Sequence, residues 1–451
     1  MKPTWSPLRK AGYASVETGV TGFELMLQVY LLEFYIRGMG LNPILASAGA
    51  AIAVFWDAIS DPLVGHLSDR YKGDRFGKRG SFILCGGLTM AVSCILIFSP
   101  PHFEEQIALF IWYLVSYLAV NTSMSFVSVP HIACVGDFTT TTSQRNSFFG
   151  WRLLFSNLGL LIGITLPGIL ATTTTEFAGR STASYWIAGV LFLGIFVFLR
   201  STRSIQSNFA SSPKIPVHKF FSALRATFKN PYFRPLLLAF SLAAVARALN
   251  SGFALFYYKD HLKLEEKTEV TVILLVFILS IIASIPFWLK LSKRFWKKDP
   301  AFLGILGLGI LSILTYPFFP SGQLTGPLAM AVLGGIAVGS ILLIESLVLD
   351  TVDFDELRTH VRKDGAYFGC WKMMAKISRA IGIMLTGPLL LLTGYDNEAA
   401  SQTPETSERI SWIFGFGVGS VFIVSALTFR RFRMTQLVSE NIKGRLKAKR
   451  N

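Results

Sequence analysis

NPILASAGAAIAVFWDAISDPLVGHLSDR, residues 42–70, is a largely apolar stretch that contains two aspartates near its middle, Asp57 and Asp61. A carboxylate in a hydrocarbon environment is costly unless a cation, a proton or a hydrogen-bond donor compensates it. The stretch is long enough to cross a bilayer as a helix, which takes about twenty apolar residues. It therefore predicts a membrane-spanning helix with two acidic side chains that need partners.

The composition of the whole chain indicates a membrane protein. Hydrophobic residues make up 52% of the 451 residues and charged residues 16%, whereas soluble domains carry charges at about a quarter of their positions. Apolar segments return along the entire length, so we predict an all-α, multi-pass membrane protein with about twelve transmembrane helices. The expected segments are 14–37, 43–67, 81–99, 106–134, 148–172, 183–199, 231–258, 270–291, 301–319, 325–349, 366–393 and 410–429.

The net charge of +16 is explained by topology rather than by a nucleic-acid partner. Lys and Arg gather in alternate loops and in the tail from Arg430, which by the positive-inside rule places both termini in the cytoplasm. The lipid bilayer is the expected partner, and the basic tail either sets topology or also contacts anionic lipid. Short loops favour a bacterial inner membrane, and we expect a monomer.

A polar stretch from Arg200 to Pro231 divides the chain near its middle. It predicts an N-terminal six-helix bundle over 1–200, a cytoplasmic loop over 201–230, a C-terminal six-helix bundle over 231–432 and a basic cytoplasmic tail over 433–451. The loop sequence HKFFSALRATFK predicts a surface-lying amphipathic helix. LSDRYKGDRFGKRG after the second helix is weakly echoed by LSKRFWKKDP after the eighth, and such duplication is typical of rocking transporters.

Signals of enzymatic chemistry are missing from the sequence. There is no phosphate-binding loop, no nucleophile motif and no histidine pair at metal-ligand spacing. The four cysteines lie in or beside apolar segments without disulfide or zinc spacing. We therefore expect no enzyme and no cofactor.

Asp57 and Asp61 are four residues apart, so in a helix they project from the same face. Two buried carboxylates on one face repel each other unless a cation lies between them or one is protonated. Oxygen ligands of this kind suit Na⁺ or H⁺, and Pro62 can free a backbone carbonyl as a further ligand. The alternative is a structural salt bridge to a neighbouring helix.

Several stretches resemble one family, the glycoside–pentoside–hexuronide:cation symporters, or melibiose permease family, of the major facilitator superfamily. They are WDAISDPLVGHLSDR, SVPHIA, SFFGWRLLFSNLG and LVLDTVDFDELRTHVRKDGAYFGCWKMMAKISRAIG. The resemblance implies a major facilitator fold that works by alternating access, with Asp57 and Asp61 as the cation site. It also implies that Lys376 couples cation and substrate, and that Arg152 contributes to the substrate site.

The sequence departs from the sugar-binding members of that family in two helices. Ser128 stands where melibiose-type members have an acid two residues before the proline, and the tryptophan that follows there is absent. Ser125 and Ser128 still offer hydroxyl oxygens to a cation. In the first helix the family's sugar-binding aspartate falls nearest Thr21, and Glu24 one turn on either replaces it or pairs with Arg247.

The remaining candidates are aromatic and charged residues. Tyr257 and Trp371 are expected to contact substrate, although packing is the common role of an aromatic residue in a chain with 13% of them. Glu17 and Glu33, near the ends of the first segment, are expected to be interface residues. The predicted cytoplasmic gate consists of Asp69 and Arg70 in one half, and of Asp350 and Arg358 in the other.

The sequence therefore predicts a secondary active transporter that couples Na⁺ or H⁺ to symport of a small polar solute, a glycoside being one candidate. A first alternative is a cation-coupled carrier of lysophospholipid or another amphiphile within the same superfamily, which the incomplete sugar-binding pattern favours. A second alternative is a membrane receptor or scaffold that transports nothing, for which buried aspartates would be unnecessary.

Overall fold

The structure is a computed structural model of the chain, and it describes residues 6–71, 77–139, 142–170, 176–202, 225–265, 269–397, 399 and 401–450. Every regular element in this described part is a helix, which confirms the all-α prediction. Most of the predicted loop 201–230, including the start of its amphipathic helix, falls outside the described residues, as do residues 72–76 of the loop after the second predicted segment.

The helices of the first half are α1 (Pro7–Ala14), α2 (Val16–Glu33), η1 (Phe34–Gly38), α3 (Pro43–Arg70), α4 (Gly77–Ile97), α5 (Gln106–Phe138), α6 (Thr142–Leu170) and α7 (Glu176–Thr202). Those of the second half are α9 (Phe233–Phe256), η3 (Tyr257–His261), α10 (Thr271–Arg294), α11 (Lys298–Thr315), η5 (Tyr316–Phe318), α12 (Thr325–Gly339), α13 (Ile341–Thr359), α14 (Asp364–Leu392), α15 (Pro404–Trp412), η6 (Ile413–Gly417), α16 (Val418–Phe429) and α17 (Gln436–Arg450).

Eleven helical spans in the described residues are long and apolar enough to cross a membrane. Continuous helical stretches count once, so α12 with α13 forms one span over Thr325–Thr359. The first predicted segment is not among the eleven, and α2 carries Glu17, Glu24 and Glu33 within its 18 residues. Each of the other predicted segments coincides with one of the spans, with ends that differ by up to ten residues, the largest difference being the end of 325–349 against Thr359.

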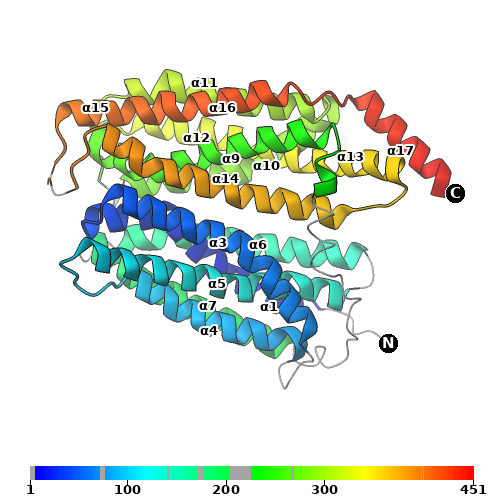
Figure 1. The fold of residues 1–451 in the computed structure, drawn as a ribbon, viewed down its shortest axis with the longest axis horizontal. Coiled ribbons are helices and arrows are strands. Elements are labelled where there is room, and N and C mark those ends of the chain that lie inside the picture. The colour runs from blue at the N-terminus through cyan, green and yellow to red at the C-terminus, as the bar shows by residue number, and fades with distance from the viewer. Residues whose placement is uncertain are drawn as a thin grey trace. The chain divides into compact units, whose positions relative to one another are not determined.

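Contacts between residues divide the chain into two compact units. Unit 1 comprises residues 1–213, 265–275 and 396–400, and unit 2 comprises 214–264, 276–395 and 401–451. Within unit 1, α5 packs on α3 and α4 (Figure 1). α2 packs on α6 and α7. Within unit 2, α9 packs on α14 and α16, and α16 also packs on α11. The six-helix limits drawn from the sequence stay a prediction.

Glycine brings α2 and α6 into backbone contact. A methyl group added at Gly163 would lie 2.2 Å from the carbonyl oxygen of Gly22, and one at Gly159 would lie 2.5 Å from the carbonyl oxygen of Thr18. Both distances are far below normal contact, so only glycine permits this approach. The crossing fixes α2, and with it Glu17 and Thr21, against α6.

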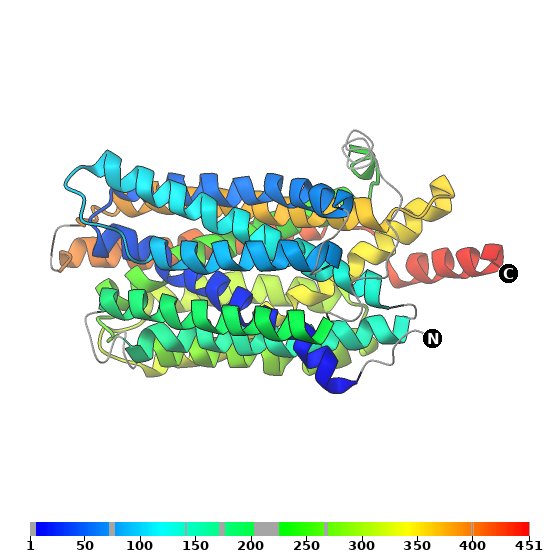
Figure 2. The ribbon, with the colours of Figure 1, turned by 90° about the horizontal axis from the view of Figure 1, so that it is seen from below.

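The basic tail is helical rather than extended. α17 follows α16 at the end of unit 2 and lies against α13 (red in Figures 1 and 2). Its apolar positions Ile442 and Leu446, one turn apart, are buried. The tail is therefore an amphipathic helix with one face packed on the protein.

Candidate functional site

The two aspartates of α3 converge on one hydroxyl group of α5. Ser125 Oγ lies 3.1 Å from Asp57 Oδ1 and 2.7 Å from Asp61 Oδ1. Asp57 and Ser125 are buried, at 7% and 1% exposure, and Asp61 is half-buried. α3 runs without interruption through Pro62, so the one-turn spacing of the aspartates is kept.

Four oxygen-bearing side chains meet in this cluster. The Ser125 hydroxyl carries one proton and can donate it to one carboxylate at a time. Ser60 Oγ lies 2.8 Å from Ser125 Oγ and supplies one further proton. Two carboxylates and two hydroxyls thus meet in a buried place, and oxygen ligands of this kind are those that a small, hard cation prefers.

The other predicted cation ligand, Ser128, is half-buried one turn further along α5, and the hydroxyl found between the carboxylates is that of Ser125. α3 and α5 are also joined one turn earlier, where Trp56 Nε1 donates to Thr122 Oγ1 at 2.9 Å.

Lys376, on α14 of unit 2, is half-buried, and its coupling role stays a prediction.

A second polar cluster in unit 1 contains Arg152. Arg152 Nε lies 2.6 Å from Glu17 Oε1, and His131 Nδ1 lies 2.9 Å from the same oxygen. His131 Nε2 lies 2.8 Å from the backbone oxygen of Tyr13. Glu17 is 7% exposed and His131 is fully buried, so Glu17 is paired inside the protein, and its place near a membrane interface stays a prediction.

Glu33, also predicted near a membrane interface, is 1% exposed, and its depth in the membrane stays a prediction. It forms an ion pair with Arg180, which is fully buried. The guanidinium of Arg180 also lies 5.2 Å from the centre of the Tyr30 ring. The Glu33 carboxylate and the Tyr30 ring together compensate the buried charge of Arg180, which gives this cluster a structural role.

The predicted substrate residues lie in both units. In unit 1, Thr21 Oγ1 lies 3.1 Å from Ser156 Oγ at the α2–α6 contact, and Glu24 accepts a hydrogen bond from Gln28 Nε2 at 3.1 Å. The suggested pairing of Glu24 with Arg247 joins residues of different units and stays a prediction.

In unit 2, three predicted substrate residues are packed among aromatic rings. Tyr257 donates its hydroxyl to the Tyr316 carbonyl at 2.7 Å and is fully buried, as expected for a packing residue. Trp371 stacks on Phe240 with ring centres 3.9 Å apart, and the guanidinium of Arg247 lies 6.0 Å from that same ring. Among the described residues, neither Trp371 Nε1 nor Arg247 Nε has a hydrogen-bond acceptor.

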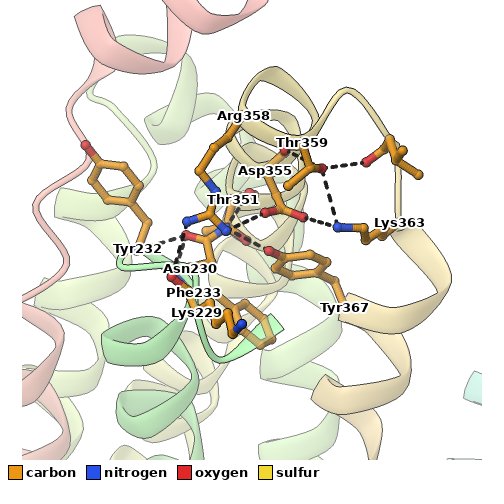
Figure 3. A network of polar contacts seen from close by, with 11 residues as sticks. Lys229, Asn230, Tyr232, Phe233, Thr351, Asp355, Arg358, Thr359, Lys363 and Tyr367 are labelled. Carbon is orange, nitrogen blue, oxygen red and sulfur yellow. Dashed lines mark hydrogen bonds and ion pairs between the residues drawn. The ribbon is translucent and has the colours of Figure 1, made fainter. Parts of the chain in front are cut away.

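Arg358, a predicted gate residue, belongs to a polar network where α9, α13 and α14 meet (Figure 3). Asn230 lies just before α9, where it accepts from the backbone N–H of Tyr232 at 3.0 Å and donates to the Tyr367 hydroxyl at 2.9 Å. Arg358 NH2 donates to Asp355 Oδ1 at 3.0 Å. Lys363 approaches the other Asp355 oxygen at 3.3 Å, so Asp355 is held by two cations.

Arg362 lies in the loop between α13 and α14 and forms ion pairs with carboxylates of both helices. It pairs with Asp353, Glu356 and Asp364 at 2.9, 2.8 and 2.7 Å. Burial lowers the pKa of Arg362, but the hydrogen bonds to these three carboxylates outweigh that effect and raise the pKa above its usual value. The guanidinium is therefore a permanent cation that fixes this turn.

Asp350, the other predicted gate residue of this half, anchors the tail helix. Its oxygens lie 2.6 Å from Lys297 Nζ and 2.7 Å from Lys443 Nζ, and Ser439 Oγ donates to it at 2.9 Å. Asp350 is 1% exposed. The side chains of Asp69 and Arg70 lie outside the described residues, so the gate as a whole stays a prediction.

The fold defines a class: a multi-pass helical membrane protein. A sequence model of the family described as MFS/sugar transport protein matches residues 12–436. The chain belongs to this family.

Known proteins share both sequence and fold with the chain. A protein of Escherichia coli (strain K12) named as a candidate glycoside/cation symporter, YagG, is 26% identical over 415 residues, which cover 90% of this chain and 87% of that protein. Sodium-dependent lysophosphatidylcholine symporter 1 of Mus musculus is 24% identical over 94% of this chain and 84% of its own length. The crystal structure of a bacterial homologue of the human lysosomal transporter Spinster covers 96% of this chain and all of its own, with a TM-score of 0.69 and 14% identity, which confirms the major facilitator fold.

Proposed function

We propose that the protein is a symporter that couples entry of Na⁺ or H⁺ to movement of a small polar solute. The observation that supports this most directly is the convergence of Asp57 and Asp61 on the Ser125 hydroxyl. An ion bound there neutralises a charged buried site, which lowers the cost of the change between outward-facing and inward-facing states. The names of both relatives include cation or sodium coupling.

Uptake by purified protein in proteoliposomes tests the coupling. The substrate panel contains a neutral glycoside, a pentoside, a hexuronate and a lysophosphatidylcholine, each with a Na⁺ gradient, a pH gradient or neither. One gradient should stimulate uptake of at least one substrate, and Asp57→Asn or Asp61→Asn should abolish the stimulation. Glu405→Gln, whose side chain is 84% exposed, is the control and should behave like the wild type. Equal stimulation in all variants would disprove the assignment.

A second candidate substrate is a lysophospholipid. The mouse relative is named for one and aligns with almost the whole chain. Helix α5 also lacks the acid and the tryptophan of the sugar-binding members. His131, in the stretch where that tryptophan would stand, makes hydrogen bonds with Glu17 and with the Tyr13 carbonyl instead. The same panel separates the two candidates, because a lysophospholipid carrier leaves the glycoside and pentoside outside the vesicle.

A further inference from the structure

The ring nitrogens of His131 both face hydrogen-bond acceptors. Nε2 lies 2.8 Å from the carbonyl oxygen of Tyr13, which can only accept. Nδ1 lies 2.9 Å from Glu17 Oε1. That oxygen also accepts a hydrogen bond from Arg152 Nε at 2.6 Å, and the permanent positive charge of the guanidinium favours the ionised form of Glu17. A neutral imidazole has a single N–H and would leave one short contact between two acceptors.

We propose that unit 1 binds a proton at His131, in addition to the ion at the aspartate pair, and holds the residue as an imidazolium. The surroundings favour the cation, because Glu17 provides a negative charge and the Tyr13 carbonyl is near the C-terminal end of α1, the negative end of the helix dipole. The site shares no residue with Asp57, Asp61 and Ser125.

The groups around His131 come from four other helices. The titratable and charged side chains are Tyr13 from α1, Glu17 from α2 and Arg152 from α6, with Cys134 one turn along α5 itself. α7 contributes the Phe198 ring, 5.5 Å away. The described surroundings thus contain two cations, His131 and Arg152, that share one carboxylate.

This sharing links the proton to Arg152. With His131 charged, Glu17 keeps one cationic partner even when Arg152 moves away, so Arg152 is held weakly. With His131 neutral, the buried Glu17 depends on Arg152 for its only countercharge and holds it firmly. Arg152 is 19% exposed on its side chain. Among the described residues its terminal nitrogens donate to no acceptor, so they can receive an acidic group when the proton is bound.

Nitrogen NMR of the full-length protein tests the protonation state. The chain has six histidines, so ¹⁵N-histidine labelling gives few signals, and His131→Gln identifies the one that belongs to His131. At neutral pH we expect two protonated ring nitrogens. Glu17→Gln should convert the ring to the neutral form, whereas Glu24→Gln, on the same helix, should not. One bare ring nitrogen in the wild type would overturn the proposal even if Glu17→Gln fails to fold.

Chemical modification tests the link to Arg152. Phenylglyoxal reacts with accessible guanidinium groups, and mass spectrometry reports the rate at each arginine. We expect Arg152 to react at least about threefold more slowly in His131→Gln, while Arg409, 60% exposed, reacts at an unchanged rate. Equal rates at Arg152 would disprove the link. Neither test needs transport, so its outcome is independent of the proposed symport.

Discussion

Ser125 is the residue through which the two aspartates meet. Its replacement by alanine removes a hydroxyl that lies within hydrogen-bond distance of both carboxylates. A hydrogen bond to a charged group contributes about 1.5–3 kcal/mol, so we expect Ser125→Ala to raise the cation concentration for half-maximal uptake by about ten- to a hundredfold. Ser123→Ala, at a buried position of the same helix, should leave it unchanged. A shift of equal size in both variants would show that the effect is only one of packing.

At the scale of single residues, the four-residue spacing in the sequence predicted the aspartate pair, but it could not predict the cluster of Glu17, His131 and Arg152. Asp57 and Asp61 lie on one helix, so their common face follows from the sequence alone. Glu17, His131 and Arg152 come from three helices, and only the packing of α2 against α6 and the register of α5 bring them together. A histidine and a glutamate inside apolar segments were the available signal, but neither identifies its partner.

Among the elements, the crossing of α2 and α6 depends most on particular residues. Gly163→Val would place a side chain into the Gly22 backbone, where the added Cβ is 2.2 Å from oxygen. We expect the helices to separate and the thermal unfolding midpoint to fall, because overpacking of this kind costs about 1–3 kcal/mol. Gly150→Ala, in α6 but with nothing within 4 Å of its Cβ, is the control. A melting curve of Gly163→Val that matches this control would rule out close backbone packing.

The tail helix α17 provides a second prediction at this scale. Asp350→Asn removes the charge that binds Lys297 and Lys443. We expect the free energy of detaching α17 to fall by about 1 kcal/mol, which raises its detached population about fivefold. Trypsin should then cleave faster after Lys443 and Arg445. Glu440→Gln changes an exposed acid of the same helix and should leave cleavage unchanged. Unaltered cleavage in Asp350→Asn would show that the apolar face alone holds the tail.

Hydropathy located the helices well because a bilayer requires continuous apolar segments. It could not determine where regular α-helical geometry is interrupted. The predicted segment 325–349 is two helices that meet at Ser340, and the first segment ends in the π-helical turn η1. Such local changes depend on neighbouring helices, whose positions a single sequence does not encode in its periodicity.

At the scale of the whole molecule, transport requires a change of state that both units share. One positive charge that enters with a neutral solute gains about 2.3 kcal/mol per 100 mV of membrane potential, enough for accumulation of some tens-fold. We therefore expect an inside-negative potassium diffusion potential to stimulate uptake in proteoliposomes of wild-type protein. Removal of the potential with valinomycin and equal potassium on both sides is the control, and uptake that ignores the potential would exclude net entry of a charge.

Lys376 offers the sharpest test of coupling. An ammonium group within a transmembrane helix is costly and is retained where it has a function. If it competes with the cation for carboxylate oxygens, Lys376→Met should allow the cation to bind at about tenfold lower concentration and should weaken the dependence of uptake on the gradient. Lys372→Met is a matched control, because this lysine lies one turn earlier on α14 and is exposed. An unchanged cation dependence in Lys376→Met, with folded protein confirmed by its melting curve, would assign Lys376 a structural role and leave coupling to the aspartates alone.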